Sequence, residues 1–265
     1  MCTPFLDLRG NPIPQDEVIA NGSSALVLLQ GGVAVRTPLR FIWTSESDVK
    51  ANLYSLQREQ DVYRRLEDPN DDRADGVVRC LGFETEATQL AYMVNGDLHA
   101  YLAKCRPSRQ QQLTWFITMA RTLSFVHNKR VLVADIASRN FLLDSDLSVK
   151  LCDFSEASLL PIDSDMEAVD DNGYTIQVDI GFLGAVMYEV ATGERCKIDL
   201  FKDNASGDGR AYWPERKFLP PTEGLWIGDI IEGCWNKEFS NARRLVCALE
   251  LVKSRLSFPA SEKSV

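Results

Sequence analysis

Three short side chains that carry oxygen atoms, Asp135, Asn140 and Asp153, are the residues of this chain best suited to chemistry. Asp135 and Asn140 lie five positions apart on a predicted loop, with an apolar run on either side. Asp153 follows thirteen positions later, at the end of a predicted strand over residues 148–152. Such oxygens hold Mg²⁺, and a carboxylate can orient an attacking hydroxyl. The spacing therefore suits phosphoryl transfer from a nucleotide.

This pattern resembles the eukaryotic protein-kinase family, whose catalytic loop reads H-R-D-x-x-x-x-N and whose metal motif reads D-F-G. The corresponding segments here are Val133–Asn140 and Asp153–Ser155, and the string D-I-A-S-R-N is closer to the tyrosine-kinase and tyrosine-kinase-like style. The resemblance implies an α+β, two-lobed fold with a small β-rich N-lobe and a larger helical C-lobe. Two unrelated turns are the alternative, because turns often contain Asp and Asn.

The elements that must position these residues can be predicted from apolar periodicity and turn signals. We expect strands at residues 18–19, 25–29, 33–35, 77–78 and 90–93, with a Gly-Gly turn at 31–32. We expect helices at residues 48–66, 97–104, 110–128, 179–191, 225–235 and 241–256. The predicted organisation is an N-lobe over 1–94 (a five-stranded sheet plus one helix), a C-lobe over 95–256 and a disordered tail over 257–265.

The composition limits the class of protein. A length of 265 residues suits one two-lobed domain, and no apolar run approaches the roughly 20 residues that cross a membrane. The net charge of −9 disfavours nucleic acid or an anionic membrane as partner. Seven cysteines without a C-x-x-C pair favour reduced thiols, so we expect a cytoplasmic or nuclear protein.

The resemblance places an ATP site between the two lobes. The glycine-rich loop pattern falls on Ala20–Val27, where only the middle glycine, Gly22, remains. The hinge resembles Leu90–Leu98, with Leu90 as gatekeeper and Met93 as the main backbone contact to adenine. The implied nucleotide-binding residues are Gly22, Val27, Ala34, Arg36, Leu90, Met93 and Leu142.

The resemblance also assigns the catalytic residues. Asp135 is the expected general base or hydroxyl-orienting residue, and Arg139 is expected to neutralise the transferring phosphoryl group. Asn140 and Asp153 are the expected Mg²⁺ ligands. Arg36 stands where the family has a lysine that contacts the α- and β-phosphates, and it is expected to pair with Glu59. Arg keeps the charge but differs from Lys in length and shape.

Other positions follow or depart from the family pattern. Val133 is expected to keep a packing role, whereas Ala134 replaces the arginine that pairs with an activation-loop phosphate, so we expect no activation by phosphorylation there. Asp179 is expected to hydrogen-bond the catalytic-loop backbone, and Arg243 to pair with Glu167. Cys152 is predicted to be a buried small residue, or else a reactive thiol; His99 and His127 are predicted to be structural.

Three functions remain open at this stage. The first is an ATP- and Mg²⁺-dependent protein kinase of low or atypical activity, supported by the complete set of Asp135, Asn140 and Asp153. The second is a pseudokinase that acts on a protein partner as an interaction or scaffold module, supported by Arg36, Ala134 and a short activation segment. A small-molecule kinase shares the loop pattern, but the hinge and the helix containing Asp179 argue against it.

Overall fold

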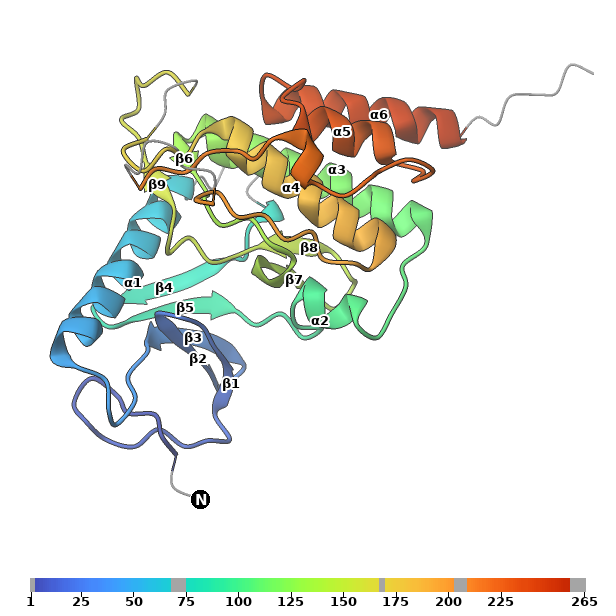
Figure 1. Ribbon diagram of the computed structural model, residues 1–265. Coiled ribbons are helices and arrows are strands. Elements are labelled where there is room, and N and C mark those ends of the chain that lie inside the picture. Colours follow the sequence, from blue (N-terminus) through green and yellow to red (C-terminus); the bar gives the residue numbers. More distant parts are fainter. Residues whose placement is uncertain (1–2, 68–74, 167–169, 203–208, 258–265) are drawn as a thin grey trace, which may run out of the picture.

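The structure, a computed structural model, describes residues 3–67, 75–166, 170–202 and 209–257. It has two lobes (Figure 1), the first built from a sheet and one long helix, and the second built mostly from helices. This arrangement confirms the predicted α+β fold class. The lobe boundary at residue 94 stays a prediction. Of the predicted tail, only Ser257 lies within the described residues, at the end of a helix.

A five-stranded antiparallel sheet forms the core of the N-lobe. Its strands, in spatial order, are β1 (Val18–Asn21), β2 (Ala25–Gln30), β3 (Val33–Pro38), β5 (Ala87–Ala91) and β4 (Cys80–Glu84). Gly31 and Gly32 close the β2–β3 hairpin with φ of +60° and +82°. Two successive positive φ angles give a two-residue turn that matches the twist of the strands, and glycine adopts them without strain.

The prediction of a sheet strand at residues 77–78 is wrong. Val77 forms only an isolated bridge with Leu151, and the Val78 N–H donates to the Leu151 carbonyl at 2.8 Å. These two β-branched residues therefore tie the N-lobe to the catalytic region instead of joining the sheet. The strand that the sequence analysis missed is β4, and β5 begins and ends earlier than the predicted strand at 90–93.

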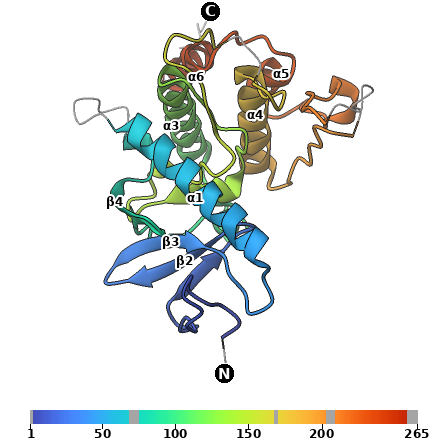
Figure 2. The same cartoon turned by 90° about the vertical axis from the view of Figure 1, so that its left-hand side faces the viewer.

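Helix α1 (Glu46–Leu66) lies across the N-lobe sheet (Figure 2). Ser45 caps its N-terminus, and the Gln60 side-chain amide donates to the carbonyls of Glu84 (2.9 Å) and Ala87 (3.1 Å). These bonds join the middle of the helix to the turn between β4 and β5. On the predicted apolar stripe, the residues Val49, Leu56, Val62 and Leu66 are buried and Leu53 is half-buried.

The C-lobe contains most of the helices and four short strands. The helices are α2 (Leu98–Leu102), α3 (Arg109–Asn128), α4 (Ile176–Thr192), α5 (Gly228–Trp235) and α6 (Ala242–Ser257), with 3-10 turns η2 (Ser138–Asn140) and η3 (Arg216–Phe218). Strand β6 (Val131–Leu132) pairs with β9 (Ser158–Leu159), and β7 (Phe141–Leu143) pairs with β8 (Val149–Leu151). These strand pairs border the catalytic loop.

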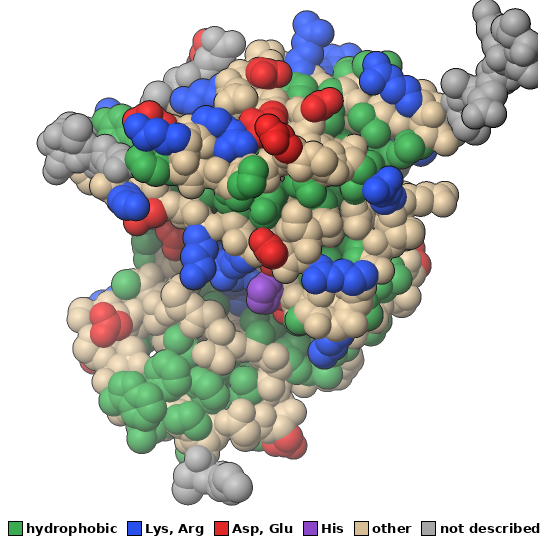
Figure 3. Space-filling view, turned by 45° about the vertical axis from the view of Figure 1, so that its right-hand side comes forward, with side chains coloured by type: hydrophobic (Ala, Val, Ile, Leu, Met, Phe, Trp, Pro, Cys, Tyr) green, Lys and Arg blue, Asp and Glu red, His purple; other side chains and the backbone are tan. Residues whose placement is uncertain are grey.

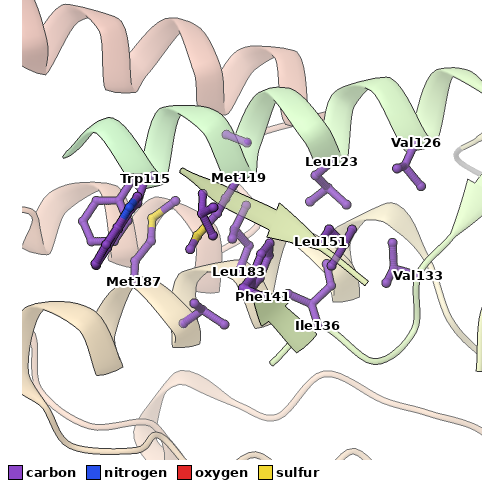
Figure 4. Close-up of a cluster of buried hydrophobic side chains, with 14 of the residues drawn as sticks. Trp115, Met119, Leu123, Val126, Val133, Ile136, Phe141, Leu151, Leu183 and Met187 are labelled. Atoms are coloured by element: carbon purple, nitrogen blue, oxygen red, sulfur yellow. The ribbon is translucent and has the colours of Figure 1, made fainter. Parts of the chain in front are cut away.

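A buried apolar core holds the catalytic loop against the helices (Figure 4). Met119 and Leu123 of α3 and Leu183 of α4 belong to this core, and each is at most 2% exposed. Val133 and Phe141, from the two flanks of the loop, are 0% and 2% exposed. Burying one such side chain contributes about 1.5–3 kcal/mol, so the loop is fixed from both ends. Val133 has the packing role that was predicted.

Helix α4 approaches the segment after it very closely at Gly181. A Cβ at this position would come within 2.4 Å of the Trp213 ring. The Trp213 indole N–H donates to the Trp235 carbonyl at 3.1 Å, which fixes the ring over the helix. The indole ring of a later segment therefore packs directly against the helix at Gly181.

Candidate active site

The catalytic loop is attached to helix α4 through Asp179, which is fully buried. Its carboxylate accepts hydrogen bonds from the backbone N–H groups of Val133 and Ala134, both at 2.9 Å. The ring Nε2 of His127 lies 2.9 Å from the same carboxylate. A charged acceptor gives strong hydrogen bonds in a buried place. The predicted contact between Asp179 and the loop backbone is therefore present.

Two residues of the site have a left-handed backbone without being glycine. Ala134 and Asp153 both have φ of +63°. This conformation costs an L-residue about 1–2 kcal/mol, so the surroundings must hold it. At Ala134 the bond from its N–H to Asp179 does so. Ser155 does not have a positive φ, so the left-handed turn of this motif lies at Asp153 and a serine fits at position 155.

Asp135 and Asn140 are connected directly. The Asn140 amide donates to the Asp135 carbonyl at 2.8 Å and to its carboxylate at 2.9 Å. The Arg139 guanidinium donates to both carboxylate oxygens of Asp135, at 2.6 and 2.7 Å. The carboxylate is therefore held in one orientation at the floor of the cleft. Arg139 and Asp135 are both partly exposed, so their ion pair adds no more than about 1 kcal/mol.

Arg36 contacts two carboxylates at once. Its Nε lies 2.9 Å from Glu59 Oε2, and its Nη2 donates to Asp153 Oδ1 at 2.7 Å. The predicted pair with Glu59 is present, although the Nε–H is not directed at that oxygen and this contact is an ion pair without a hydrogen bond. The contact with Asp153 was not predicted. It joins strand β3 of the N-lobe to the segment Asp153–Ser155 of the C-lobe.

Burial and charge act in opposite directions on these carboxylates. Burial raises the pKa of Glu59 to about 7, although Arg36 lowers it. Burial also raises the pKa of Asp153, but the charge and hydrogen bond of Arg36 outweigh burial, and the net pKa is lowered. The difference follows from position, because Glu59 is completely buried on α1 whereas the Asp153 side chain is 28% exposed to the cleft. Asp153 is therefore ionised at neutral pH.

These side chains line one cleft of about 500 Å³ between the lobes, visible as a recess in Figure 3. All the predicted nucleotide-binding and metal-binding residues lie in its wall, together with three of the four predicted catalytic ones, Arg36 belonging to both sets: Gly22, Val27, Ala34, Arg36, Leu90, Met93, Leu142, Asn140, Asp153, Asp135 and Arg139. Glu59, the fourth, is not in the wall but contacts Arg36. The volume suits a small organic ligand such as a nucleotide.

The chemistry of the donor atoms suits a hard divalent cation. Asn140 uses its amide N–H groups for Asp135, which leaves its amide oxygen as a ligand atom. Asp153 has one carboxylate oxygen on Arg36 and a second one outside that contact. Within the described residues, no group of three or more His, Cys, Asp or Glu could hold a metal by itself. A Mg²⁺ ion here would need phosphate and water oxygens as further ligands, as is usual for Mg²⁺.

Cys152 lines the cleft as a free thiol. Its Sγ donates to the Asn140 carbonyl at 3.3 Å, and burial raises its pKa well above the ordinary value. This environment favours the buried-residue interpretation over a reactive thiolate. His127 contacts Asp179, and His99 contacts Glu189 at 2.7 Å, so both histidines have structural partners.

The sequence analysis assigned no site role to two acidic residues of the cleft wall, Asp97 and Glu156. Glu156 is exposed and follows Ser155 directly. The only signals available were the place of Asp97 in the hinge segment and that of Glu156 directly after the Asp153–Ser155 motif. The predicted pair of Arg243 with Glu167 lies outside the described residues, because residues 167–169 are not among them.

The two lobes, the anchored loop and the cleft define a protein-kinase-like domain. The model of the protein tyrosine and serine/threonine kinase family matches residues 45–249. This chain therefore belongs to the protein tyrosine and serine/threonine kinase family.

Similar proteins include both kinds of kinase. The tyrosine-protein kinase receptor TYRO3 of Danio rerio is 28% identical over 199 residues, covering 66% of this chain and 22% of that protein. The probable serine/threonine-protein kinase PBL22 of Arabidopsis thaliana is 29% identical over 197 residues, covering 62% of this chain and 50% of the relative. The matched region thus spans half or less of each relative. Within the described residues no helix has the length and hydrophobicity to span a membrane.

Proposed function

We propose that this kinase domain binds ATP in the cleft and transfers its γ-phosphate to a hydroxyl group of a protein. The observation that carries the proposal is that Asp135, Asn140 and Asp153 line one cleft, where Arg36 contacts Asp153. Kinase catalysis consists mainly of positioning and charge stabilisation, and these residues supply the groups for both.

Each residue has a role in this proposal. The Asp135 carboxylate orients the attacking hydroxyl and accepts its proton. Asn140 and Asp153 would hold Mg²⁺, which when bound would neutralise charge on the phosphates. Arg139 lies on Asp135 and can turn to the phosphoryl group as negative charge develops there. Arg36 contributes positive charge behind Asp153.

The adenine part of the nucleotide would lie between apolar side chains from the two lobes. Val27, Ala34 and Leu90 line the N-lobe side of the cleft, and Leu142 lines the C-lobe side. Backbone groups near Met93 would bind the adenine edge. On the phosphate side, Gly22 is the one glycine of the β1–β2 turn, and a Cβ there would have its nearest contact at 3.8 Å.

Phosphate transfer to a general protein substrate, measured with radiolabelled ATP, tests this function. We expect Asp135→Asn to lower the rate by about 10²–10⁴-fold, because the base is lost while the side chain keeps its size. Arg36→Lys is expected to raise the rate, since lysine is the residue on which the family mechanism depends. Glu223→Gln, at an exposed turn, serves as the control. A rate that is unchanged in both variants would contradict the proposal.

A second function is favoured by one contact. The hydrogen bond from Arg36 to Asp153 occupies an oxygen that a kinase uses for metal. A pseudokinase that binds nucleotide and acts as an interaction module for a protein partner would tolerate this contact. It would bind ATP but show no transfer sensitive to Asp135→Asn, so the same assay combined with a binding measurement separates the two functions.

A further inference from the structure

Arg36 spans the distance between two acids that belong to different lobes. Its Nε contacts Glu59 on helix α1, and its Nη2 contacts Asp153 in the metal motif. The guanidinium is buried, with 8% of the residue exposed, yet it is part of the cleft wall. Its third nitrogen, Nη1, takes part in neither contact.

A lysine at this position would contact the two acids through one nitrogen only. An ammonium is a single point charge, whereas a guanidinium presents five N–H donors in a planar fork. Arg36 therefore meets Glu59 and Asp153 with different nitrogens and keeps N–H groups for a further anion. In the described part of the chain, no hydrogen bond engages Nη1. The phosphates of a nucleotide in this cleft are anions that such a fork binds well.

The contact between Arg36 and Asp153 changes the charge that a bound polyphosphate would meet in the cleft. An ionised Asp153 repels polyphosphate, and a metal ion between the two normally removes that repulsion. Here Arg36 shares its one positive charge between Glu59 and Asp153 and so offsets part of the Asp153 charge, and Arg139 pairs with Asp135. Two further acids line the cleft. Asp97 caps helix α2 through the Ala100 N–H, and Glu156 is exposed to solvent, where its charge is screened.

We propose that this cleft binds ATP without Mg²⁺, with Arg36 in place of the metal as the group that separates Asp153 from the phosphates. Mg²⁺ is then needed for phosphoryl transfer but not for binding. The inference rests on the proposed function, because it concerns the same nucleotide site. It gives Arg36 a role in the affinity for ATP, which is separate from any effect of Arg36 on the rate of phosphoryl transfer.

The test measures the dissociation constant of ATP by calorimetry at pH 8, with excess EDTA or with excess MgCl₂. For the natural chain we expect the two constants to agree within about twofold. For Arg36→Lys we expect Mg²⁺ to tighten binding by about tenfold or more, because a single ammonium must divide its contacts among Glu59, Asp153 and the phosphates. Arg40→Lys is the matched control, since Arg40 contacts Glu46 away from the cleft, and it should behave like the natural chain.

A second variant keeps the test decisive if Arg36→Lys does not fold. Asp153→Asn removes the charge that a metal would need but leaves Arg36 in place. We expect it to bind ATP in MgCl₂ within about threefold of the natural chain. A large loss of Mg²⁺-supported binding would overturn the inference.

The outcomes separate the two proposals. Binding by the natural chain that requires Mg²⁺, or an Arg36→Lys variant as insensitive to Mg²⁺ as the natural chain, overturns this inference and leaves the proposed function in place. No binding of ATP in either condition overturns the proposed function and this inference with it.

Discussion

The ion pair between Arg36 and Glu59 is buried, so the cost of removing its charges from water is larger than for an exposed ion pair. Glu59 is completely buried on helix α1, and its second oxygen accepts a hydrogen bond from the Phe154 N–H at 3.3 Å. Taking both charges out of water is costly, and a single misdirected ion pair repays this cost only in part. The charge state of Glu59 therefore depends on pH in the neutral range.

We predict a specific pH dependence of stability from Glu59. Its pKa is about 7 in the folded state and near the ordinary 4.5 when the chain is unfolded. Between these values the folded state binds a proton that the unfolded state lacks, so the free energy of unfolding falls as pH rises from about 4.5 to about 7. Glu59→Gln should remove this component, as measured by urea denaturation at several pH values.

The control for that experiment is Glu232→Gln. The hydrogen bond with Arg216 lowers the pKa of Glu232, so its contribution is present above the ordinary pKa and is lost as pH falls. In a plot of unfolding free energy against pH, Glu232→Gln should therefore change the acidic part, whereas Glu59→Gln should change the part between about pH 4.5 and 7. A Glu59→Gln profile identical to that of the natural chain would show that Glu59 does not titrate near neutral pH.

At the scale of elements, helix α4 determines where the catalytic loop lies. Asp179 is in its first turn, and Gly181 and Trp213 fix the next turn against the following segment. At the other end of the helix, Glu189 accepts a hydrogen bond from the Ser138 hydroxyl at 2.8 Å. The helix therefore contacts the loop on both sides of Asp135.

Removing the Asp179 carboxylate should loosen the loop. Asp179→Ala leaves the N–H groups of Val133 and Ala134 buried without partners, and each such group costs about 1–3 kcal/mol. We expect a loss of roughly 3 kcal/mol in the free energy of unfolding, measured by chemical denaturation. Glu223→Ala, in an exposed turn, should change it by no more than about 0.5 kcal/mol. Equal stability of the two variants would show that Asp179 does not hold the loop.

The activation segment provides another prediction at this scale. Ala134 is 6% exposed and has no charge to offer a phosphate, and the Ser158 hydroxyl donates to the Asp170 carboxylate at 2.6 Å. A phosphate on Ser158 would therefore meet a carboxylate. We expect Ser158→Ala and Ser164→Ala to keep transfer activity within about twofold. Ser158→Ala should also lower the free energy of unfolding by roughly 1 kcal/mol, because its hydrogen bond is lost. Abolished activity in either variant would show that phosphorylation activates this chain.

At the scale of the whole molecule, the cleft joins the two lobes. Its wall combines strands β1–β3 and β5 of the N-lobe with the loop and strand β7 of the C-lobe. Across the same boundary, Arg65 of helix α1 donates to the carbonyls of Lys129 and Leu160, at 3.3 and 3.1 Å. A ligand that fills the cleft should therefore stabilise both lobes together.

ATP should raise the melting temperature of the whole chain. At a concentration about 100-fold above the dissociation constant, binding adds about 2.7 kcal/mol to stability. For a domain of this size we expect a shift of roughly 5 °C or more in a single transition, followed by differential scanning calorimetry. Inorganic triphosphate, which lacks the adenine, is the control and should give a smaller shift. A shift of only one lobe's transition, or an equal shift with triphosphate, would contradict binding across the cleft.

Local sequence patterns were sufficient to predict the helices and one hairpin of this protein. The helices follow from apolar periodicity and capping residues, and the β2–β3 hairpin follows from its two glycines, because these signals lie within a few residues of the feature they predict. The order of Asp135, Asn140, Asp153 and Asp179 identified the family, and the family implied the cleft.

Contacts between residues far apart in the sequence were decided only by the tertiary structure. The contact from Arg36 to Asp153 joins positions 117 residues apart, and Trp213 meets Gly181, which lies 32 positions earlier in the chain. Val77 and Val78 had the composition of a sheet strand, but packing against Leu151 placed them beside the catalytic region. Such features depend on geometry between elements, which residue type and short-range spacing do not encode. The family resemblance named Arg36 as a phosphate contact, and only the tertiary structure revealed that it is also the partner of Asp153, the predicted metal ligand.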